Sequence, residues 1–322
     1  MNRDIDVLVV GDANPDLILR GDVVPRFGQS EQLLDSADLT VGGSGAIVAH
    51  GLARLGLRTV LVAVIGADTF GTLTREQLRA AGIDTAELRI DPERPTGLSV
   101  ILTHGDTRTT LTLIGAIAAL DPAGIGADLL ARARHVHASS FFLQPRLAAG
   151  LAGLFRRAHD VGTTTSLDTN LDPADRWDGL DDVLPLTDVL LPNRTEILGL
   201  AARYGSAFGT TEGEDEVVAA ARVIATLGPL VVVKDGERGA LAVGRDGSVL
   251  REPGHPVVAV DSTGAGDSFD AAFLAARVKG LPLPAGLAVA CRAGALSTLG
   301  VGGTTTQATA EQVNLTEAVP LR

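Results

Sequence analysis

A glycine-rich turn followed by an aspartate is the strongest chemical signal in the sequence. Residues 260–271 read VDSTGAGDSFDA, and an amphipathic pattern through Phe269, Phe273 and Val278 continues to Gly280. This pattern predicts a turn that opens a helix, with Gly280 just past the C-terminal end. Backbone N–H groups and the positive end of the helix dipole meet at such a turn, so it binds anions, most often phosphate.

Asp267 stands at the start of this predicted helix, beside the phosphate site. We expect the N–H donors and the dipole to favour its charged form, which makes it a carboxylate at neutral pH. A carboxylate there can take the proton from a hydroxyl group while the hydroxyl oxygen attacks phosphorus. The alternative is that Asp267 only caps the helix.

Other phosphate-binding motifs are missing from the sequence. No GK dipeptide occurs, which excludes a G-x-x-x-x-G-K-[ST] loop. The first apolar run leads into GDANPD instead of G-x-G-x-x-G, and in the nearest match, Gly43-Ser44-Gly45, Val48 takes the place of the last glycine. The H-R-D and D-F-G signatures of protein kinases are also absent. These absences argue against a P-loop NTPase, a nicotinamide dehydrogenase and a protein kinase.

Apolar runs alternate with helical patterns along most of the chain. The runs predict buried strands at residues 6–11, 59–66, 135–139, 163–168, 188–192 and 230–234. The helical patterns cover residues 44–55, 72–81, 146–159 and 216–227. Repeated strand–helix units with short connections predict an α/β fold with a mostly parallel sheet covered on both faces.

Two segments break this rhythm and predict a second, smaller sheet. Residues 17–41 contain an alternating run, and residues 97–115 contain two alternating runs around HGDT. Alternation around a Gly-Asp turn is typical of an antiparallel hairpin. We expect these strands to project from the main domain, where they can cover a site or form a dimer contact. The alternative is an ordinary extension of the main sheet.

The balance of charge limits the classes of partner. Lys and Arg total 27 against 39 Asp and Glu, for a net charge of −12. We therefore expect no nucleic-acid partner and no binding to an anionic membrane. Cys291 is the only cysteine, which excludes an internal disulfide framework and a cysteine-rich zinc site. With neither a long apolar segment nor a signal-peptide pattern, the expected location is the cytoplasm.

DSTGAGDSF is similar to the C-terminal signature of the ribokinase-like (PfkB) carbohydrate kinase family, and further pieces follow in that family's order. They are VVGDANPDLIL, VGGSGAIVAHGLARLG with VAVIGADTFG, LDTN with Trp177 downstream, LLPNRTE, VVVKDGERGA and ALSTLGVGGT. Together they extend from about residue 6 to 305. The resemblance implies one ribokinase-like domain over residues 1–322, with a β lid from about 13–41 and 96–115.

The resemblance also implies ATP as phosphoryl donor, Mg2+ as metal and a hydroxyl group of a small polar molecule as acceptor. Asp267 is then the general base, and the backbone N–H groups of Gly264, Ala265 and Gly266 form the anion hole. The implied nucleotide-binding residues are Asn193, Lys234, Gly236, Gly239, Thr263, Gly264 and Gly266. Asn193 and Glu196 would hold Mg2+ through water, or would simply cap a helix. Lys234 would flank the nucleotide, or lie at a solvated strand end.

A monovalent cation, K+, is a further implied cofactor, because Asp261 and Thr263 match the position beside the anion hole where family members often bind one. The residues implied for the acceptor are Asn14, Asp16, Gly42, Gly43, Ile47, Arg108 and Gln144. Arg108 would meet a carboxylate or phosphate of the substrate, or be solvated.

The sequence departs from ribokinase proper at two positions of the acceptor site. Ser44 stands where ribokinase proper has a lysine, and Ile47 stands where it has an asparagine that holds sugar hydroxyls. A site that loses such a group discriminates differently, so we expect D-ribose to be a poor acceptor. Alternatively, Ile47 packs under the lid while Asn14 or Gln144 supplies the polar contacts.

The leading hypothesis is an ATP-dependent kinase for a sugar or sugar derivative, active as a homodimer joined through the β lid. A nucleoside kinase of the same fold is the alternative, favoured by Ile47 and by Phe141 and Phe142, which follow a predicted strand near the expected acceptor pocket. A catalytically silent nucleotide-binding regulator is a third hypothesis, against which the intact GAGD argues.

Overall fold

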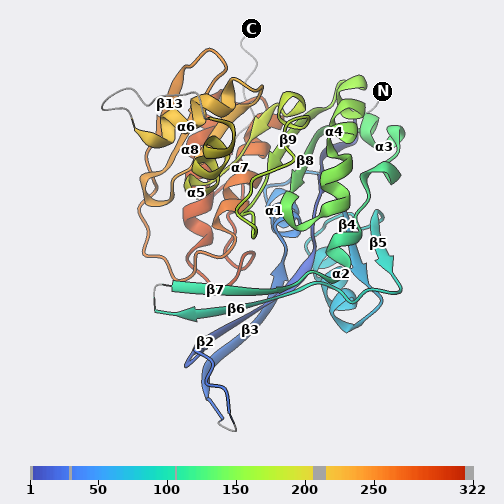
Figure 1. Cartoon of the computed structure of the whole chain (residues 1–322), viewed down its shortest axis with the longest axis vertical. Helices are drawn as coiled ribbons and strands as arrows, with labels where there is room; N and C mark the ends of the chain where they lie inside the picture. Colours follow the sequence, from blue (N-terminus) through green and yellow to red (C-terminus); the bar gives the residue numbers. More distant parts are fainter. Residues whose placement is uncertain (1–2, 29–30, 106, 206–214, 316–322) are drawn as a thin grey trace.

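A nine-stranded sheet forms the centre of the protein in the computed structural model, which describes residues 3–28, 31–105, 107–205 and 215–315 (Figure 1). Its strand order is β13-β12-β11-β10-β9-β8-β1-β4-β5. In chain order these are β1 (Ile5–Val10), β4 (Thr59–Gly66), β5 (Leu88–Asp91), β8 (Ala133–Ser139), β9 (Thr164–Asp168), β10 (Val189–Leu190), β11 (Leu230–Lys234), β12 (Ala240–Val243) and β13 (Val249–Glu252). The strands from β11 to β5 pair in parallel, and β12 and β13 add an antiparallel edge.

Helices cover both faces of this sheet and bury two hydrophobic cores. One core contains residues of α3 (Ala127–Arg132), α4 (Pro145–Asp160), α5 (Arg194–Tyr204) and α6 (Glu216–Ala225). The other contains residues of α1 (Ser44–Arg54), α2 (Thr69–Ala80), α7 (Ala265–Val278) and α8 (Leu283–Ser297). Short 3-10 turns lie at Gly115–Ala119, Pro122–Gly124, Phe141–Leu143, Leu184–Leu186 and Gly236–Arg238. The predicted α/β architecture is confirmed.

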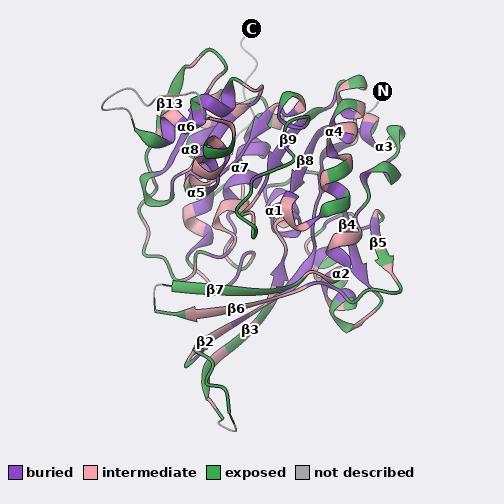
Figure 2. Ribbon diagram, viewed as in Figure 1, coloured by how far each residue is buried: buried purple, intermediate pink, exposed green. Residues whose placement is uncertain are grey.

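The central strands are continuous apolar runs because both of their faces are covered. Every residue of β4, TVLVAVIG, is buried, and Figure 2 shows the same purple burial along the middle of the sheet. Gly280 has φ +76° just past the end of α7, as the sequence predicted. Within the described ranges, no helix is long and apolar enough to cross a membrane.

A separate four-stranded sheet, called the lid from here on, projects from the main domain (Figure 1). Its order is β3 (Leu34–Gly42), β2 (Asn14–Gly21), β6 (Leu98–His104) and β7 (Thr107–Leu113). The predicted second sheet is confirmed, and the alternative of an edge extension is wrong. β6 and β7 pair antiparallel as the predicted hairpin. The predicted Gly-Asp turn includes Asp106, which lies outside the described residues.

Candidate active site

The predicted anion site lies at the N-terminal end of α7. Gly264 is the N-cap, with φ +70°, and no described side chain caps the helix. A Cβ atom at Gly264 would lie 2.5 Å from the Cα of Gly303, so both the conformation and the close approach require glycine. No described side chain takes the first-turn N–H groups of α7, although the N–H of Ala265 donates to the carbonyl oxygen of Ser262 over 3.3 Å. A helix end without a side-chain cap can bind an anion. Asp267 lies in the first turn and not at the cap, so the capping alternative is wrong.

Asp267 meets a side chain that sequence reasoning missed. Ser44, the first residue of α1, donates a hydrogen bond of 2.5 Å from its Oγ to Asp267 Oδ1. Burial, and then the negative charge of Asp168, raise the pKa of Asp267 to about 7. Our expectation of a fully ionised carboxylate at neutral pH is therefore wrong. Desolvation of the carboxyl group outweighs the favourable end of the helix dipole.

The acceptor residues gather where β1 leads into β2. Asp16 is buried, and Asn14 Nδ2 donates to its Oδ1 over 3.1 Å and to Ser99 Oγ over 3.3 Å. A Cβ atom at Gly42 would lie 1.9 Å from Asp16 Oδ1, so this glycine makes room for the carboxyl group. Burial, and then the charge of Asp12, raise the pKa of Asp16 to about 7.

Asp12 is a second carboxyl group that the sequence did not single out. It is buried, its Oδ1 accepts the N–H of Gly45 over 2.9 Å, and burial raises its pKa. Gly43, with φ +84°, leaves room beside Asn14 Oδ1. Gly42 lies against the carboxyl group of Asp16, and Ser44, two residues further on, donates to Asp267, so the structure brings the predicted base and the predicted acceptor aspartate together.

Two predicted acceptor residues lie in packed surroundings instead. Ile47 is 3% exposed, and a Cβ atom at Gly303 would lie 2.6 Å from its Cδ1. This supports the packing alternative for Ile47. Gln144 is fully buried, and its Nε2 donates to the carbonyl oxygens of Ser139 and Ser140 over 2.8 and 3.3 Å. Its amide group therefore holds the turn after β8, which argues against contact with an acceptor.

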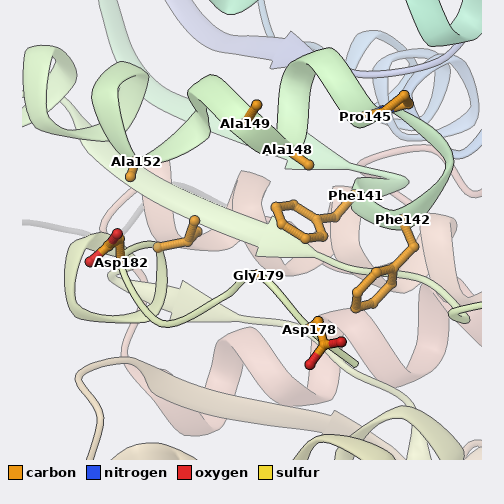
Figure 3. Close-up of a pocket in the computed structure, with 10 residues that line it drawn as sticks. Phe141, Phe142, Pro145, Ala148, Ala149, Ala152, Asp178, Gly179 and Asp182 are labelled. Carbon is orange, nitrogen blue, oxygen red and sulfur yellow. The ribbon is translucent and has the colours of Figure 1, made fainter. Parts of the chain in front are cut away.

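Phe141 and Phe142 pack against other apolar and aromatic side chains. Phe141 is buried in the core under α4, and the ring of Phe142 meets those of Phe141 and Trp177 edge to face. The two rings border a cavity of about 330 Å³ together with residues of α4 and of the 178–183 segment (Figure 3). No residue predicted to bind the acceptor lines this cavity. The aromatic pair therefore gives no support to a nucleoside acceptor.

Asn193 and Glu196 form a capping box at the start of α5. Asn193 Oδ1 accepts the N–H of Glu196 over 3.0 Å, and Glu196 Oε2 accepts the N–H of Asn193 over 2.8 Å. Burial, and then the charge of Asp168, raise the pKa of Glu196 to about 8. The structure confirms that Asn193 and Glu196 cap the helix. The same residues could still bind a metal through water. Gly236 and Gly239 have φ +59° and +93° and shape the turn between β11 and β12.

Lys234 lies beneath the anion site. Its Nζ donates to Asp168 Oδ2 over 2.7 Å and to Asp270 Oδ2 over 2.9 Å, and the side chain is 10% exposed. A Cβ atom at Gly266 would lie 3.5 Å from this nitrogen. The solvated alternative is wrong, and the ammonium group faces two buried carboxyl groups, neither of which was among the predicted site residues. Burial raises the pKa of Asp270 well above its usual range.

The turn before the anion site contacts the lid. Oδ1 of Asp261 accepts from the backbone N–H and the Oγ1 of Thr263, over 2.9 and 2.8 Å. Arg108 of β7 donates from Nη1 to Thr263 Oγ1 over 3.1 Å, so it is not merely solvated. Arg20 of β2, absent from the predicted site, forms an ion pair of 3.3 Å with Asp261.

Comparisons with known proteins agree with this geometry. Residues 4–310 match the family described as pfkB family carbohydrate kinase. An ATP-dependent ribose-1-phosphate kinase of Halopiger xanaduensis is 33% identical over 272 residues, 84% of each chain. A nucleoside kinase of Methanothermobacter thermautotrophicus is 29% identical over 291 residues, 88% of this chain and 86% of that protein. The solved ribokinase of Arabidopsis thaliana, complexed with ribose and ATP, is 25% identical, with a TM-score of 0.83 and 98% of both chains covered.

The fold, with its parallel sheet, two helical layers and β lid, is therefore ribokinase-like, as the resemblance implied. The chain belongs to the pfkB family of carbohydrate kinases. It is an ATP-dependent kinase whose acceptor group is an alcohol.

Proposed function

We propose that this kinase transfers the γ-phosphoryl group of ATP to a hydroxyl group of a small sugar or sugar derivative, with Asp267 as general base. The observation that carries the proposal is the position of Asp267 in the first turn of the uncapped helix α7, where it accepts from Ser44, two residues after the Gly42 that lies against Asp16. A base is most effective when its pKa lies near the working pH, and the pKa of Asp267 is raised to about 7.

The backbone around Gly264, Ala265 and Gly266 serves as the anion hole. N–H groups fixed in the first turn of α7 stabilise the charge on the transferring phosphoryl group without having to reorient. Lys234, beneath Gly266, adds a positive charge on the same side. Asp16 accepts hydrogen bonds from acceptor hydroxyl groups, and Asn14 orients it.

The nucleotide binds beside β10 and β11, along Asn193, Gly236, Gly239 and Thr263. Mg2+ keeps most of its water shell and needs only one or two carboxylates besides the phosphates. Glu196 supplies the carboxyl group in this proposal. Asn193 donates to both of its oxygen atoms, over 2.8 and 2.6 Å, and a carboxylate has further lone pairs with which to accept from the water molecules of the metal. A bound metal would neutralise phosphate charge, and Glu196, whose position the capping box with Asn193 fixes, would hold it through water.

The acceptor is a sugar or sugar derivative in this proposal, and D-ribose is a poor one, because Ile47 offers no hydrogen bond. A nucleoside acceptor is the second candidate, and the relative named as a nucleoside kinase favours it. A panel of sugars, sugar acids, ribose 1-phosphate and nucleosides, assayed for ADP release, tests both. If none of these acceptors leads to ADP release, the proposal is contradicted. If ribose is the best substrate, our interpretation of Ile47 is contradicted.

The lid also offers a surface for a homodimer. Leu39, Leu17, Val100 and Leu111 pair across its four strands in one row, on the face opposite Asp16. Leu39 is 42% exposed and Leu111 54%. A row of exposed apolar side chains on a sheet face favours burial against a second copy. We place the active dimer in the cytoplasm, where the single, buried Cys291 stays reduced.

A further inference from the structure

Two arginines of the lid reach the turn that leads into the anion site. Arg20 on β2 is paired with Thr103 on β6, and Thr103 is paired with Arg108 on β7. Directly paired residues of adjacent strands point to the same face of a sheet, so the two arginines share one row of the lid. Arg20 lies 3.3 Å from Asp261, and Arg108 donates to Thr263. Both residues of the implied monovalent-cation site thus contact a lid arginine.

The carboxylate of Asp261 has little capacity left for another cation. Its Oδ1 accepts two hydrogen bonds from Thr263, and its Oδ2 accepts the N–H of Gly302 over 2.9 Å. Arg20 Nη2 approaches the same Oδ2 atom. A carboxylate offers about four lone-pair directions. Three of them take hydrogen bonds, and Arg20 faces the carboxylate at 3.3 Å as an ion pair without a hydrogen bond. The hydroxyl of Thr263 is likewise occupied, since it donates to Asp261 and accepts from Arg108.

These contacts do not fit a K+ ion at Asp261. K+ needs oxygen ligands with free lone pairs, and a guanidinium group beside the same oxygen repels it. Arg20 carries the same single positive charge that the ion would carry, and its ion pair with Asp261 is largely shielded, at 23% and 6% side-chain exposure. We propose that Arg20 replaces the monovalent cation in this protein, so that the kinase works without K+.

The replacement links the two halves of the site. Asp16 and Arg20 are four residues apart on β2 and therefore lie on one face of the strand. One strand of the lid thus carries both the acceptor aspartate and the cation that pairs with the turn before Gly264. A free ion would hold this turn whatever the position of the lid. Arg20 holds it only while the lid lies against the turn.

We test this inference by comparing initial rates of phosphoryl transfer in KCl and in tetramethylammonium chloride at equal ionic strength. Because this assay measures kinase activity, the inference here rests on the proposed function. Equal ionic strength keeps screening the same. The wild-type rates should agree within about twofold, the scale of weak surface-charge effects. Arg20→Met should lose at least about tenfold in tetramethylammonium chloride, or about 1.4 kcal/mol, and KCl should restore part of the loss. Arg26→Met is the control, because Arg26 follows the same lid strand, β2, and pairs with Asp22 on the surface, away from Asp261.

Thermal unfolding in the two salts gives a readout that needs no acceptor. KCl should raise the melting temperature of Arg20→Met above its value in tetramethylammonium chloride and leave that of the wild type unchanged. Should Arg20→Met fail to fold, Arg20→Lys keeps the charge and should stay insensitive to KCl. Three results would overturn the inference. The first is activation of the wild type by K+, and the second is an Arg20→Met protein that K+ changes in neither assay. The third is an Arg20→Lys protein that depends on K+. If the wild type is inactive towards every acceptor, the proposed function is rejected, but the thermal unfolding measurements still test the inference about Arg20.

Discussion

Ser44→Ala is expected to move the pH dependence of catalysis towards higher pH. The hydroxyl of Ser44 donates to Asp267 over 2.5 Å and thereby favours the charged form of the carboxyl group. Burial and the charge of Asp168 have already raised the pKa of Asp267 to about 7, and Ser44 opposes that rise. Without the hydroxyl group, the base is protonated over a wider range of pH.

The size of the change follows from the contact. A hydrogen bond to a charged group contributes about 1.5–3 kcal/mol, and one pH unit corresponds to about 1.4 kcal/mol. The acidic limb of the pH–rate profile should therefore shift to higher pH by about one to two units. At pH 7 the rate of Ser44→Ala should be at least about fivefold below that of the wild type, because the fraction of ionised base falls. At pH well above the shifted limb the two rates should converge.

The assay is kcat/KM for the acceptor as a function of pH, since this quantity reports ionisations of the free enzyme. Ser44→Thr keeps the hydroxyl group and is the control. Asp16 titrates in the same range, so the limb belongs to the coupled pair, and the comparison between variants carries the test. A limb that stays in place or moves to lower pH in Ser44→Ala would refute the reasoning. So would a loss of rate that is equal at every pH.

Four further predictions concern the same sites. Asp267→Asn should lower kcat by about 10²–10⁴ while calorimetry shows intact ATP binding, and more than a tenth of the wild-type kcat would remove Asp267 from the base role. Gly266→Val should lower kcat by a larger factor than it lowers the affinity for substrates, because even a Cβ atom at this position would lie 3.5 Å from Lys234 Nζ. An unchanged kcat would contradict the assignment of Gly266 to the anion hole. Asp16→Ala should raise the acceptor KM at least tenfold, about 1.4 kcal/mol, and equal rises for acceptor and ATP would assign it to the fold. Leu111→Asp should give monomers in sedimentation if the lid forms the dimer.

The fold was predictable from the sequence wherever the burial of an element produces a recognisable pattern of apolar residues along the chain. β1 and β4 are buried on both faces and appear as unbroken apolar runs. The same rule explains a miss, because α8, LPAGLAVACRAGALS, is covered along so much of its surface that it has no long polar face to mark it as a helix. The capping box of Asn193 and Glu196 was a usable signal for α5.

The site was predictable where the chemistry lies within one short segment. The turn from Asp261 to Asp267 is local, so its glycines and its aspartate could be assigned from their order alone. Ser44 meets Asp267 across 223 positions of sequence, and Arg20 meets Asp261 across 241. The only sequence signal for Ser44 was its departure from the lysine of ribokinase proper. The direction of the Asp267 pKa also depends on burial by distant segments, which no local pattern records.

The buried charges beneath Gly266 explain how an anion site and a raised base coexist. Against its burial, the ammonium group of Lys234 lowers the pKa of Asp168, whereas burial raises the pKa of Asp270 well above its usual range. The cluster acts on Asp267 in two directions, because the charge of Asp168 raises the pKa of Asp267 and the charge of Lys234 lowers it. The burial of Asp267 itself remains the larger effect, and it sets the base near neutrality while Lys234 still faces the anion site.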